Sequence, residues 1–252
     1  MKHDDLETDP KRDRDLPLVK LLPNLLTLTA ACAGLTGVRF ALLGEFQWSV
    51  RMVLIATILD GLDGRLARLL RSQSPLGAEL DSLADFLNFG VAPALILYLW
   101  TLNDVGGIGW MASLCFTLCC LLRLARFNVG QKNGNGSSDY FEGVPSPAGA
   151  LLVMMPMVAA FAFPGLPEIP AWLSTIYVLA IGLLMISRIH TFSFKNVKIP
   201  RRNARYVLLG AVLAAALLFN FTWATLLLVM IAYLATILVA LRVKPGGGQK
   251  DL

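Results

Sequence analysis

Apolar stretches long enough to cross a lipid bilayer recur along almost the whole chain. An α-helix needs about 20 mostly apolar residues to cross a hydrocarbon core of about 30 Å. Hydropathy predicts eight such stretches, at residues 25–43, 48–70, 82–101, 107–126, 146–163, 171–187, 206–220 and 223–241. The chain is therefore predicted to be all-α, a polytopic bundle of transmembrane helices.

The polar segments at the two ends lie outside these stretches. Residues 1–22 mix acidic and basic side chains without an apolar core, so they do not have the pattern of a cleavable signal peptide. We expect a cytoplasmic tail at 1–22, a single membrane domain at 23–242 and a second cytoplasmic tail at 243–252. The composition agrees, because 56% of the residues are hydrophobic and only 15% are charged.

The basic residues indicate how the helices are oriented. Arg39 and Arg51 flank the first connection on one side of the membrane, and the other twenty of the 22 Lys and Arg residues fall in the tails and in the connections on the opposite side. Positive residues are retained on the cytoplasmic side. This bias predicts an even number of spans and places both termini in the cytoplasm.

Four acidic residues interrupt the apolar pattern. Asp60 and Asp63 lie near the end of the second stretch, and Asp81 and Asp85 lie at the start of the third. The spacings of three and four residues place each pair on one face of its helix. Ionisable groups in membrane segments are unfavourable and therefore suggest a function.

The connection between the two acidic pairs is short and contains Ser74, Pro75 and Gly77 as helix-breaking residues. We therefore expect antiparallel helices whose acidic faces meet. Four converging carboxylates repel one another unless they share protons or bind cations. All-oxygen ligands select hard ions such as Mg²⁺, Mn²⁺ or Ca²⁺, and a site with several carboxylates has room for two of them.

A second interpretation is that the acids pair with Arg65, Arg68 and Arg71, which lie between the two acidic pairs. Two glycines in the same stretch favour a binding site. Gly61 and Gly64 weaken a helix, so a helix that keeps both is expected to let a ligand approach its backbone closely. A phosphate fits this description, and Arg68 lies one helical turn from Gly64 with a fork of donors suited to phosphate oxygens.

Residues 60–85 resemble the motif of the CDP-alcohol phosphotransferases, D-x-x-D-G-x-x-A-R, eight residues, G-x-x-x-D-x-x-x-D. The matching positions are Asp60, Asp63, Gly64, Ala67, Arg68, Gly77, Asp81 and Asp85. The resemblance implies two Mg²⁺ or Mn²⁺ ions held by the four aspartates, with Asp85 also acting as the general base. It further implies that Gly64, Arg68 and Gly77 belong to the site for the CDP group.

Other segments make the chain similar to the members of this family that form phosphatidylserine. These segments are Leu22–Thr27, Glu79–Asp85, Phe89–Ala94, Arg123–Asn128 and Phe141–Pro147. The resemblance implies CDP-diacylglycerol and L-serine as substrates, a homodimer, membrane lipid as the surroundings and no nucleic-acid partner. It also implies a multi-pass protein of a prokaryotic cell membrane whose active site faces the cytoplasm.

Five further residues are candidates for substrate contacts. Arg123 and Arg126 are suited to hold the carboxylate of serine and Glu142 its ammonium group, although each arginine is equally well explained as a topology signal at a helix end. Asn24 and Thr27 are placed to contact CDP-diacylglycerol, while Asn24 is also an ordinary helix cap.

Two other functions are considered for this sequence. The aspartate motif does not separate serine from glycerol 3-phosphate, inositol phosphate or choline as the acceptor. A divalent-cation transporter also carries acids in its membrane helices, but those acids are expected throughout the depth of the membrane. In this chain the acids gather near one surface, together with Gly64 and Arg68.

Overall fold

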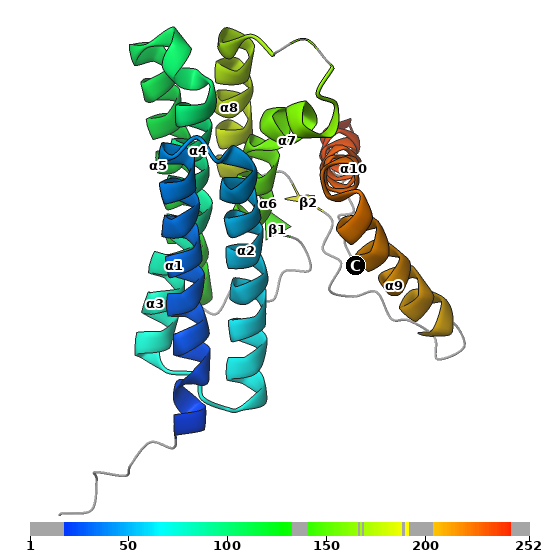
Figure 1. Ribbon diagram of the computed structural model, residues 1–252. Coiled ribbons are helices and arrows are strands. Elements are labelled where there is room, and N and C mark those ends of the chain that lie inside the picture. The colour runs from blue at the N-terminus through cyan, green and yellow to red at the C-terminus, as the bar shows by residue number, and fades with distance from the viewer. Residues whose placement is uncertain are drawn as a thin grey trace, which may run out of the picture.

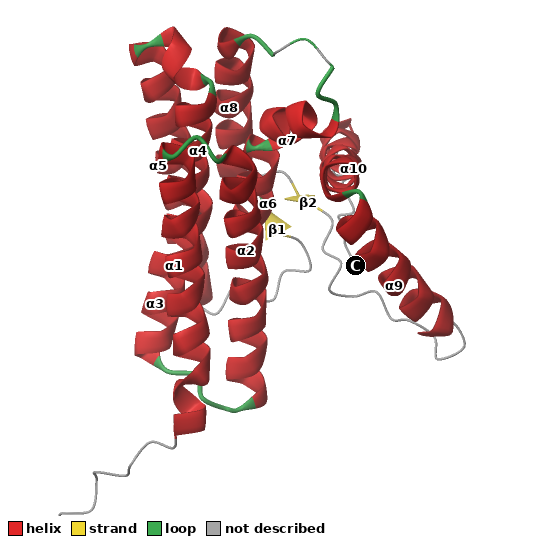
Figure 2. Cartoon of the chain, in the orientation of Figure 1, coloured by secondary structure: helices red, strands yellow, loops and turns green. Residues whose placement is uncertain are grey.

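The computed structural model describes residues 18–132, 141–165, 167, 169–187, 190–191 and 204–242, and this part of the chain is almost entirely helical (Figures 1 and 2). Its α-helices are α1 (Leu22–Leu42), α2 (Phe46–Leu69), α3 (Pro75–Asp85), α4 (Ala92–Trp100), α5 (Gly107–Lys132), α6 (Ser146–Val153), α7 (Met155–Ala162), α8 (Ala171–Ile186), α9 (Ala204–Asn220) and α10 (Thr222–Arg242). The remaining elements are the short helices η1 (Leu18–Leu21), η2 (Phe86–Val91) and η3 (Leu102–Val105) and the strands β1 (Phe141–Glu142) and β2 (His190–Thr191).

Small residues let α1 and α2 pack closely. The buried face of α1 consists of Pro23, Thr27, Ala30, Gly34, Gly37 and Ala41. A side-chain carbon on Gly37 would lie only 3.2 Å from the carbonyl oxygen of Ser49 in α2. Small residues at such positions favour helix association in lipid. The opposite faces of α1 expose Leu25, Leu28 and Leu35, as expected for a helix that contacts lipid.

A tight turn reverses the chain between α2 and α3. Arg71 adopts a left-handed conformation with φ of 49°, and the next amide, of Ser72, donates to the carbonyl of Ala67 at 3.0 Å. This pattern ends α2 with a Schellman motif. Ser74 then caps α3, because its Oγ accepts from the amide of Gly77 at 3.0 Å. The two helices are antiparallel, as predicted (Figure 1), but Gly77 lies in the first turn of α3 and does not break it.

The third membrane segment is one continuous helical segment, in which α3, η2 and α4 follow one another without a gap. It begins at Pro75, seven residues before the predicted start at residue 82. Its middle part, η2, is a π-helical turn. Pro93, near the start of α4, has no amide proton for the helix ladder, and a widened turn precedes it. Asn88 in this turn is fully buried, and its side chain occupies the space that the missing side chain of Gly34 leaves on α1.

The segment predicted as one span at 146–163 is not one continuous helix but is divided into the two short helices α6 and α7. The chain leaves the helical path at Met154, directly before α7, and α7 turns across the bundle (Figure 1). The cause is Pro156, which cannot donate to the carbonyl of Leu152. That carbonyl instead accepts from the hydroxyl of Tyr177 in α8 at 2.8 Å.

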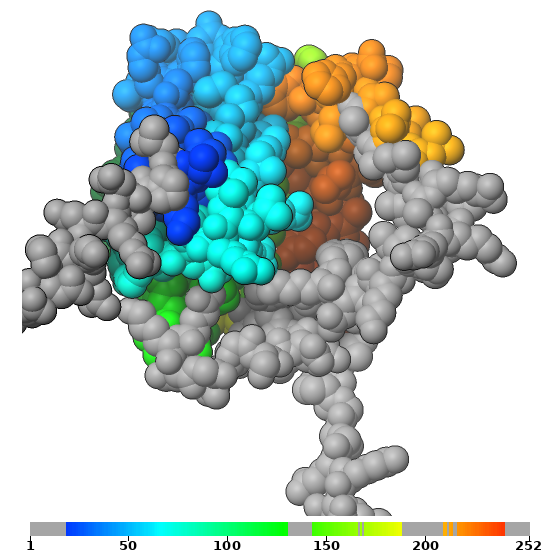
Figure 3. Space-filling view, turned by 90° about the horizontal axis from the view of Figure 1, so that it is seen from below, coloured from blue at the N-terminus to red at the C-terminus, as the bar shows by residue number. Residues whose placement is uncertain are grey.

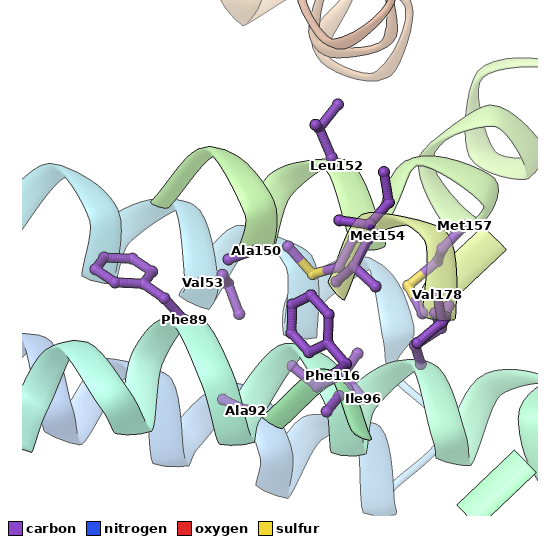
Figure 4. Close-up of a cluster of buried hydrophobic side chains, with 14 of the residues drawn as sticks. Val53, Phe89, Ala92, Ile96, Phe116, Ala150, Leu152, Met154, Met157 and Val178 are labelled. Atoms are coloured by element: carbon purple, nitrogen blue, oxygen red, sulfur yellow. The ribbon is translucent and has the colours of Figure 1, made fainter. Parts of the chain in front are cut away.

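The hydrophobic core lies where α2, α4, α5, α6, α7 and α8 meet, and Figure 4 shows part of it. Its labelled side chains are Val53, Phe89, Ala92, Ile96, Phe116, Ala150, Leu152, Met154, Met157 and Val178. Phe89 and Phe116 are fully buried there. The core therefore draws on helices from most of the chain.

Four helical stretches of the described chain are long and apolar enough to cross a membrane, which fits a multi-pass protein. They are Val19–Leu42, Pro75–Trp100, Gly107–Gly130 and Thr222–Val239. Four of the eight predicted spans thus correspond to such helices. The others correspond to the charged helix α2, the divided pair α6 and α7, and the shorter helices α8 and α9.

The C-terminal helices are arranged differently from each other. Figure 1 shows α9 projecting away from the bundle, whereas α10 packs against α7, α6 and β2. Strand β1 pairs with β2 in antiparallel fashion, with Phe141 opposite Thr191. This pairing joins the segment before α6 to the segment after α8. At the other end of the chain, residues 18–22 of the predicted tail are helical.

Candidate active site

The four aspartates meet at one end of the bundle. Single carboxylate oxygens of Asp60, Asp63 and Asp81 all lie within 4.8 Å of one another. The carboxyl group of Asp85 is within hydrogen-bonding distance of that of Asp60. The predicted convergence of the two acidic pairs is confirmed. Figure 3 looks at this end, where the start of α1, the end of α2 and the start of α3 (blue to cyan) gather on one side and α9 (orange) and α10 (dark orange-red) on the other.

No ion pair within the described residues neutralises these carboxylates. Arg65, Arg68 and Arg71 are exposed and none of them forms an ion pair with the aspartates among the described residues, so the interpretation that they pair with the acids is wrong. Asp63 is only 3% exposed, and Oδ1 of Asp85 is buried without a hydrogen-bond partner in the described chain. The repulsion between close carboxylates in such a setting is relieved by a shared proton or by a cation from outside the chain. The cluster can therefore hold a divalent metal, and its oxygen ligands suit a hard ion.

Thr27 supports the cluster from α1. Its hydroxyl donates to Oδ2 of Asp63 at 2.5 Å and also lies 3.1 Å from the carbonyl oxygen of Pro23. Thr27 is 5% exposed. The side chain was expected to contact CDP-diacylglycerol, but the structure gives its hydroxyl another partner, the carboxylate of a candidate metal ligand.

The exposed face of α2 beside the aspartates has no side chains at two positions. A side-chain carbon on Gly61 or Gly64 would meet no atom of the described chain within 4 Å. Packing inside the protein therefore does not explain these glycines. Nε of the exposed Arg68 donates to the carbonyl of Gly64 at 3.0 Å, so the guanidinium group lies along the same stretch of helix.

Gly77 and Asn24 lie at a close contact between α3 and α1. A side-chain carbon on Gly77 would lie 2.9 Å from Oδ1 of Asn24. The helix α1 begins at Leu22, and no side chain caps it. Asn24 is thus inside the first turn, and its interpretation as a helix cap is wrong. The contact explains why position 77 has no side chain whether or not a ligand binds there.

A second hydrogen bond joins α5 to α3 at a position between the two aspartates of α3. Nδ2 of Asn128, near the end of α5, donates to Oγ of Ser82 at 3.0 Å. Ser82 lies between Asp81 and Asp85, so α5 restrains the part of α3 that carries both carboxylates.

Arg123 and Arg126 have different surroundings although they lie three residues apart on α5. Arg123 is half-buried, donates from a terminal nitrogen to Oγ of Ser146 at 2.5 Å, and lies within electrostatic range of Asp85 and Tyr233. Arg126 is exposed and donates to the carbonyl of Ile186, the last residue of α8, at 2.9 Å. Arg126 thus caps the C-terminus of α8.

Glu142 lies in β1 on the backbone, but its side chain is outside the described part of the structure. The prediction that it meets an ammonium group therefore remains a prediction.

Two residues near Arg123 were not predicted from the sequence. Ser146 begins α6, and nothing in its neighbouring residues indicates a partner in α5. Tyr233 had a detectable signal, because it is the one ionisable side chain in the apolar stretch 223–241 of α10.

Known proteins are similar in sequence to this chain over most of its length. The family model of the CDP-alcohol phosphatidyltransferases matches residues 20–187. The CDP-diacylglycerol–serine O-phosphatidyltransferase of Mycobacterium leprae is 39% identical over 83% of this chain and 71% of its own length. Proteins of the same description from Helicobacter pylori (strain ATCC 700392 / 26695) and Methanocaldococcus jannaschii are 38% and 35% identical over 71% and 64% of this chain, and over 74% and 70% of their own lengths.

The family match includes all four aspartates, Gly64 and Arg68, and it ends after α8. Its range therefore contains the complete acidic cluster and the exposed glycine face of α2. The chain belongs to the CDP-alcohol phosphatidyltransferase family.

Proposed function

We propose that this protein transfers a phosphatidyl group from CDP-diacylglycerol to the hydroxyl of L-serine, which gives phosphatidylserine and CMP. The observation that carries the proposal is the cluster of Asp60, Asp63, Asp81 and Asp85 beside the exposed glycine face of α2. The choice of serine is supported by the relatives from bacteria and an archaeon, whose names give serine as the acceptor.

The four aspartates would hold two Mg²⁺ or Mn²⁺ ions. When bound, these ions neutralise charge on the pyrophosphate and stabilise the leaving CMP. Thr27 holds Asp63 in a fixed orientation through its hydrogen bond, and Asn128 restrains α3 through Ser82. Such supporting contacts keep ligand groups in position before substrate arrives.

The CDP group of the donor would lie along α2. Gly61 and Gly64 leave the helix backbone accessible, and the exposed guanidinium of Arg68 is available to phosphate oxygens. Asn24 and Gly77 form the neighbouring contact between α1 and α3, which borders the same end of the bundle. In this arrangement Thr27 acts on the donor indirectly, through Asp63.

Asp85 is the proposed general base. The serine oxygen attacks the phosphorus that carries diacylglycerol, the bond from this phosphorus to the CMP oxygen breaks, and the serine hydroxyl proton passes to the Asp85 carboxylate. Oδ1 of Asp85 suits this role because it has no hydrogen-bond partner within the described residues. Arg123 would hold the serine carboxylate, since it lies within electrostatic range of Asp85. Glu142 is assigned to the ammonium group.

The membrane arrangement is part of the same proposal. Residues 23–242 form one membrane domain with eight passes, with both termini and the active site on the cytoplasmic side of a prokaryotic cell membrane. Twenty of the 22 basic residues support this orientation. The protein functions as a homodimer.

An assay of acceptors tests the function. Purified protein in detergent is incubated with CDP-diacylglycerol, Mn²⁺ or Mg²⁺ and labelled acceptors, and CMP release is measured together with the lipid product. We expect CMP release with serine, and loss of turnover when a chelator removes the metal. Turnover with glycerol 3-phosphate but not with serine would contradict the choice of acceptor.

A further inference from the structure

Three polar groups around Arg123 have unused hydrogen-bonding capacity. Nε of Arg123 is buried without a partner in the described chain, although a terminal nitrogen of the same group donates to Ser146. Oδ1 of Asp85 is likewise buried and without a partner among the described residues. The hydroxyl of Tyr233 makes no hydrogen bond with any described residue, and Arg123 lies within electrostatic range of both Asp85 and Tyr233. The buried Nε of Arg123 and Oδ1 of Asp85 would normally have hydrogen-bond partners.

Packing holds Tyr233 in its place. Met230 and Ile237, three residues before it and four after it on α10, are 3% and 1% exposed, so this face of the helix is fixed against the core. Tyr233 itself is half-buried against the same core. The helix also packs against α6, which begins with the Ser146 that binds Arg123, and against β2. The buried face of α10 therefore holds Tyr233 against the core, within electrostatic range of Arg123.

We propose that Tyr233 determines acceptor specificity, with its hydroxyl and the Arg123 guanidinium together binding the carboxylate of serine. One cation and one neutral donor match a group with a single negative charge. A phosphate acceptor carries up to two negative charges and would be poorly neutralised by the same pair. This inference rests on the proposed function, because it assigns a further residue to the serine site.

The position of Tyr233 in the chain supports a role in choosing the acceptor. The family match ends at residue 187, whereas α10 begins at Thr222. The matched region contains the aspartates and the glycine face of α2, which are assigned to the donor and to phosphoryl transfer. A helix outside this region is free to differ between enzymes that share the donor but use different acceptors.

The experiment compares Tyr233→Phe with the unchanged protein in the full-length form. The matched control is Tyr98→Phe, which removes a tyrosine hydroxyl that donates to Asn103 at 2.9 Å, away from Arg123. Initial rates of CMP release are measured while serine and CDP-diacylglycerol are varied in turn. For Tyr233→Phe we expect the KM for serine to rise about tenfold, as for one lost hydrogen bond to a charged group. The KM for CDP-diacylglycerol and kcat should stay within about twofold, and Tyr98→Phe should leave all three constants unchanged.

Each other result overturns the inference. A serine KM that stays within twofold removes Tyr233 from the acceptor site. A fall in kcat with both KM values unchanged, or a parallel rise of both KM values, shows that the hydroxyl serves the fold or the chemical step instead. Failure of the proposed function is distinguishable, because the unchanged protein would then release no CMP with serine.

Discussion

The hydroxyl of Thr27 on α1 donates a 2.5 Å hydrogen bond to Oδ2 of Asp63 on α2. Both side chains are buried, at 5% and 3% exposure. The bond connects the acidic cluster to a helix that contributes no carboxylate to it. Hydrogen bonds to buried charged groups are stronger than those between neutral groups, because the charge has few other ways to be stabilised.

Replacing Thr27 by Val keeps the shape of the side chain and removes this donor. We expect turnover at limiting metal to fall by about 10- to 100-fold, as is usual when a contact that orients a metal ligand is lost. The measurement is CMP release as a function of Mn²⁺ concentration, in which the apparent metal affinity should weaken. Thr27→Ser retains a hydroxyl and should recover most of the affinity. Equal metal dependence in Thr27→Val and the unchanged protein would contradict a supporting role.

Each of the four aspartates should be needed for turnover. We expect the substitutions Asp60→Ala, Asp63→Ala, Asp81→Ala and Asp85→Ala to abolish CMP release while the protein still inserts into the membrane, because each removes a carboxylate from one cluster. Asp104→Ala, at an exposed position in η3, is the control and should retain activity. In Asp85→Asn the loss of a general base should lower kcat by about 10²- to 10⁴-fold. Near-normal activity in that variant would remove Asp85 from the role of base.

Gly64→Ala separates the effect on binding from the effect on folding. The added carbon meets no atom of the described chain within 4 Å, and alanine favours a helix over glycine by about 1 kcal/mol. Thermal stability should therefore stay the same or rise. The KM for CDP-diacylglycerol should nevertheless increase at least about tenfold, because the carbon occupies space assigned to the CDP group, and 1.4 kcal/mol of lost contact gives this factor.

The control for Gly64→Ala is Gly210→Ala in α9, where the added carbon also meets no described atom. It should change neither activity nor the KM for CDP-diacylglycerol. Unchanged kinetics in Gly64→Ala would show that the donor does not approach α2 at this position.

Arg123→Gln and Arg126→Gln should have different effects although the two residues are one helical turn apart. Arg123→Gln should raise the KM for serine by about 10- to 100-fold, because it removes a cation assigned to the serine carboxylate. Arg126→Gln loses the cap on the carbonyl of Ile186, so it should lower the free energy of unfolding by about 1 kcal/mol and leave the serine KM nearly unchanged. Kinetics and thermal unfolding in detergent measure the two effects. The reverse pattern would move the serine site from Arg123 to Arg126.

The features of the site that follow from local spacing could be predicted from the sequence. Asp60 and Asp63, and Asp81 and Asp85, share helical faces because of their spacing, and the short connection forces the two helices to be antiparallel. Neither inference requires knowledge of the rest of the fold. The contact of Thr27 with Asp63 could not be predicted in this way, because it depends on how α1 packs against α2. Nothing in the sequence around Thr27 indicates that Asp63 is its partner.

The errors also have physical causes. A hydropathy average over 146–163 hides Pro156, which divides the segment into α6 and α7. Asn24 resembled a helix cap because the apolar stretch begins after it, but η1 and the first turn of α1 start earlier. The separate roles of Arg123 and Arg126 depend on Ser146 and Ile186, which follow them by more than 20 residues in the chain.

The acidic cluster makes the stability of the folded protein depend on the concentration of divalent metal. Its carboxylates lie close together without an ion pair from the described residues, so their repulsion opposes the folded arrangement of α2 and α3 unless a shared proton or a cation reduces it. A ligand that binds only the folded state stabilises it by about 2.7 kcal/mol at a hundred times its Kd. Depletion of the divalent metal that the cluster binds would therefore promote unfolding and proteolysis of the protein as well as reduce its turnover.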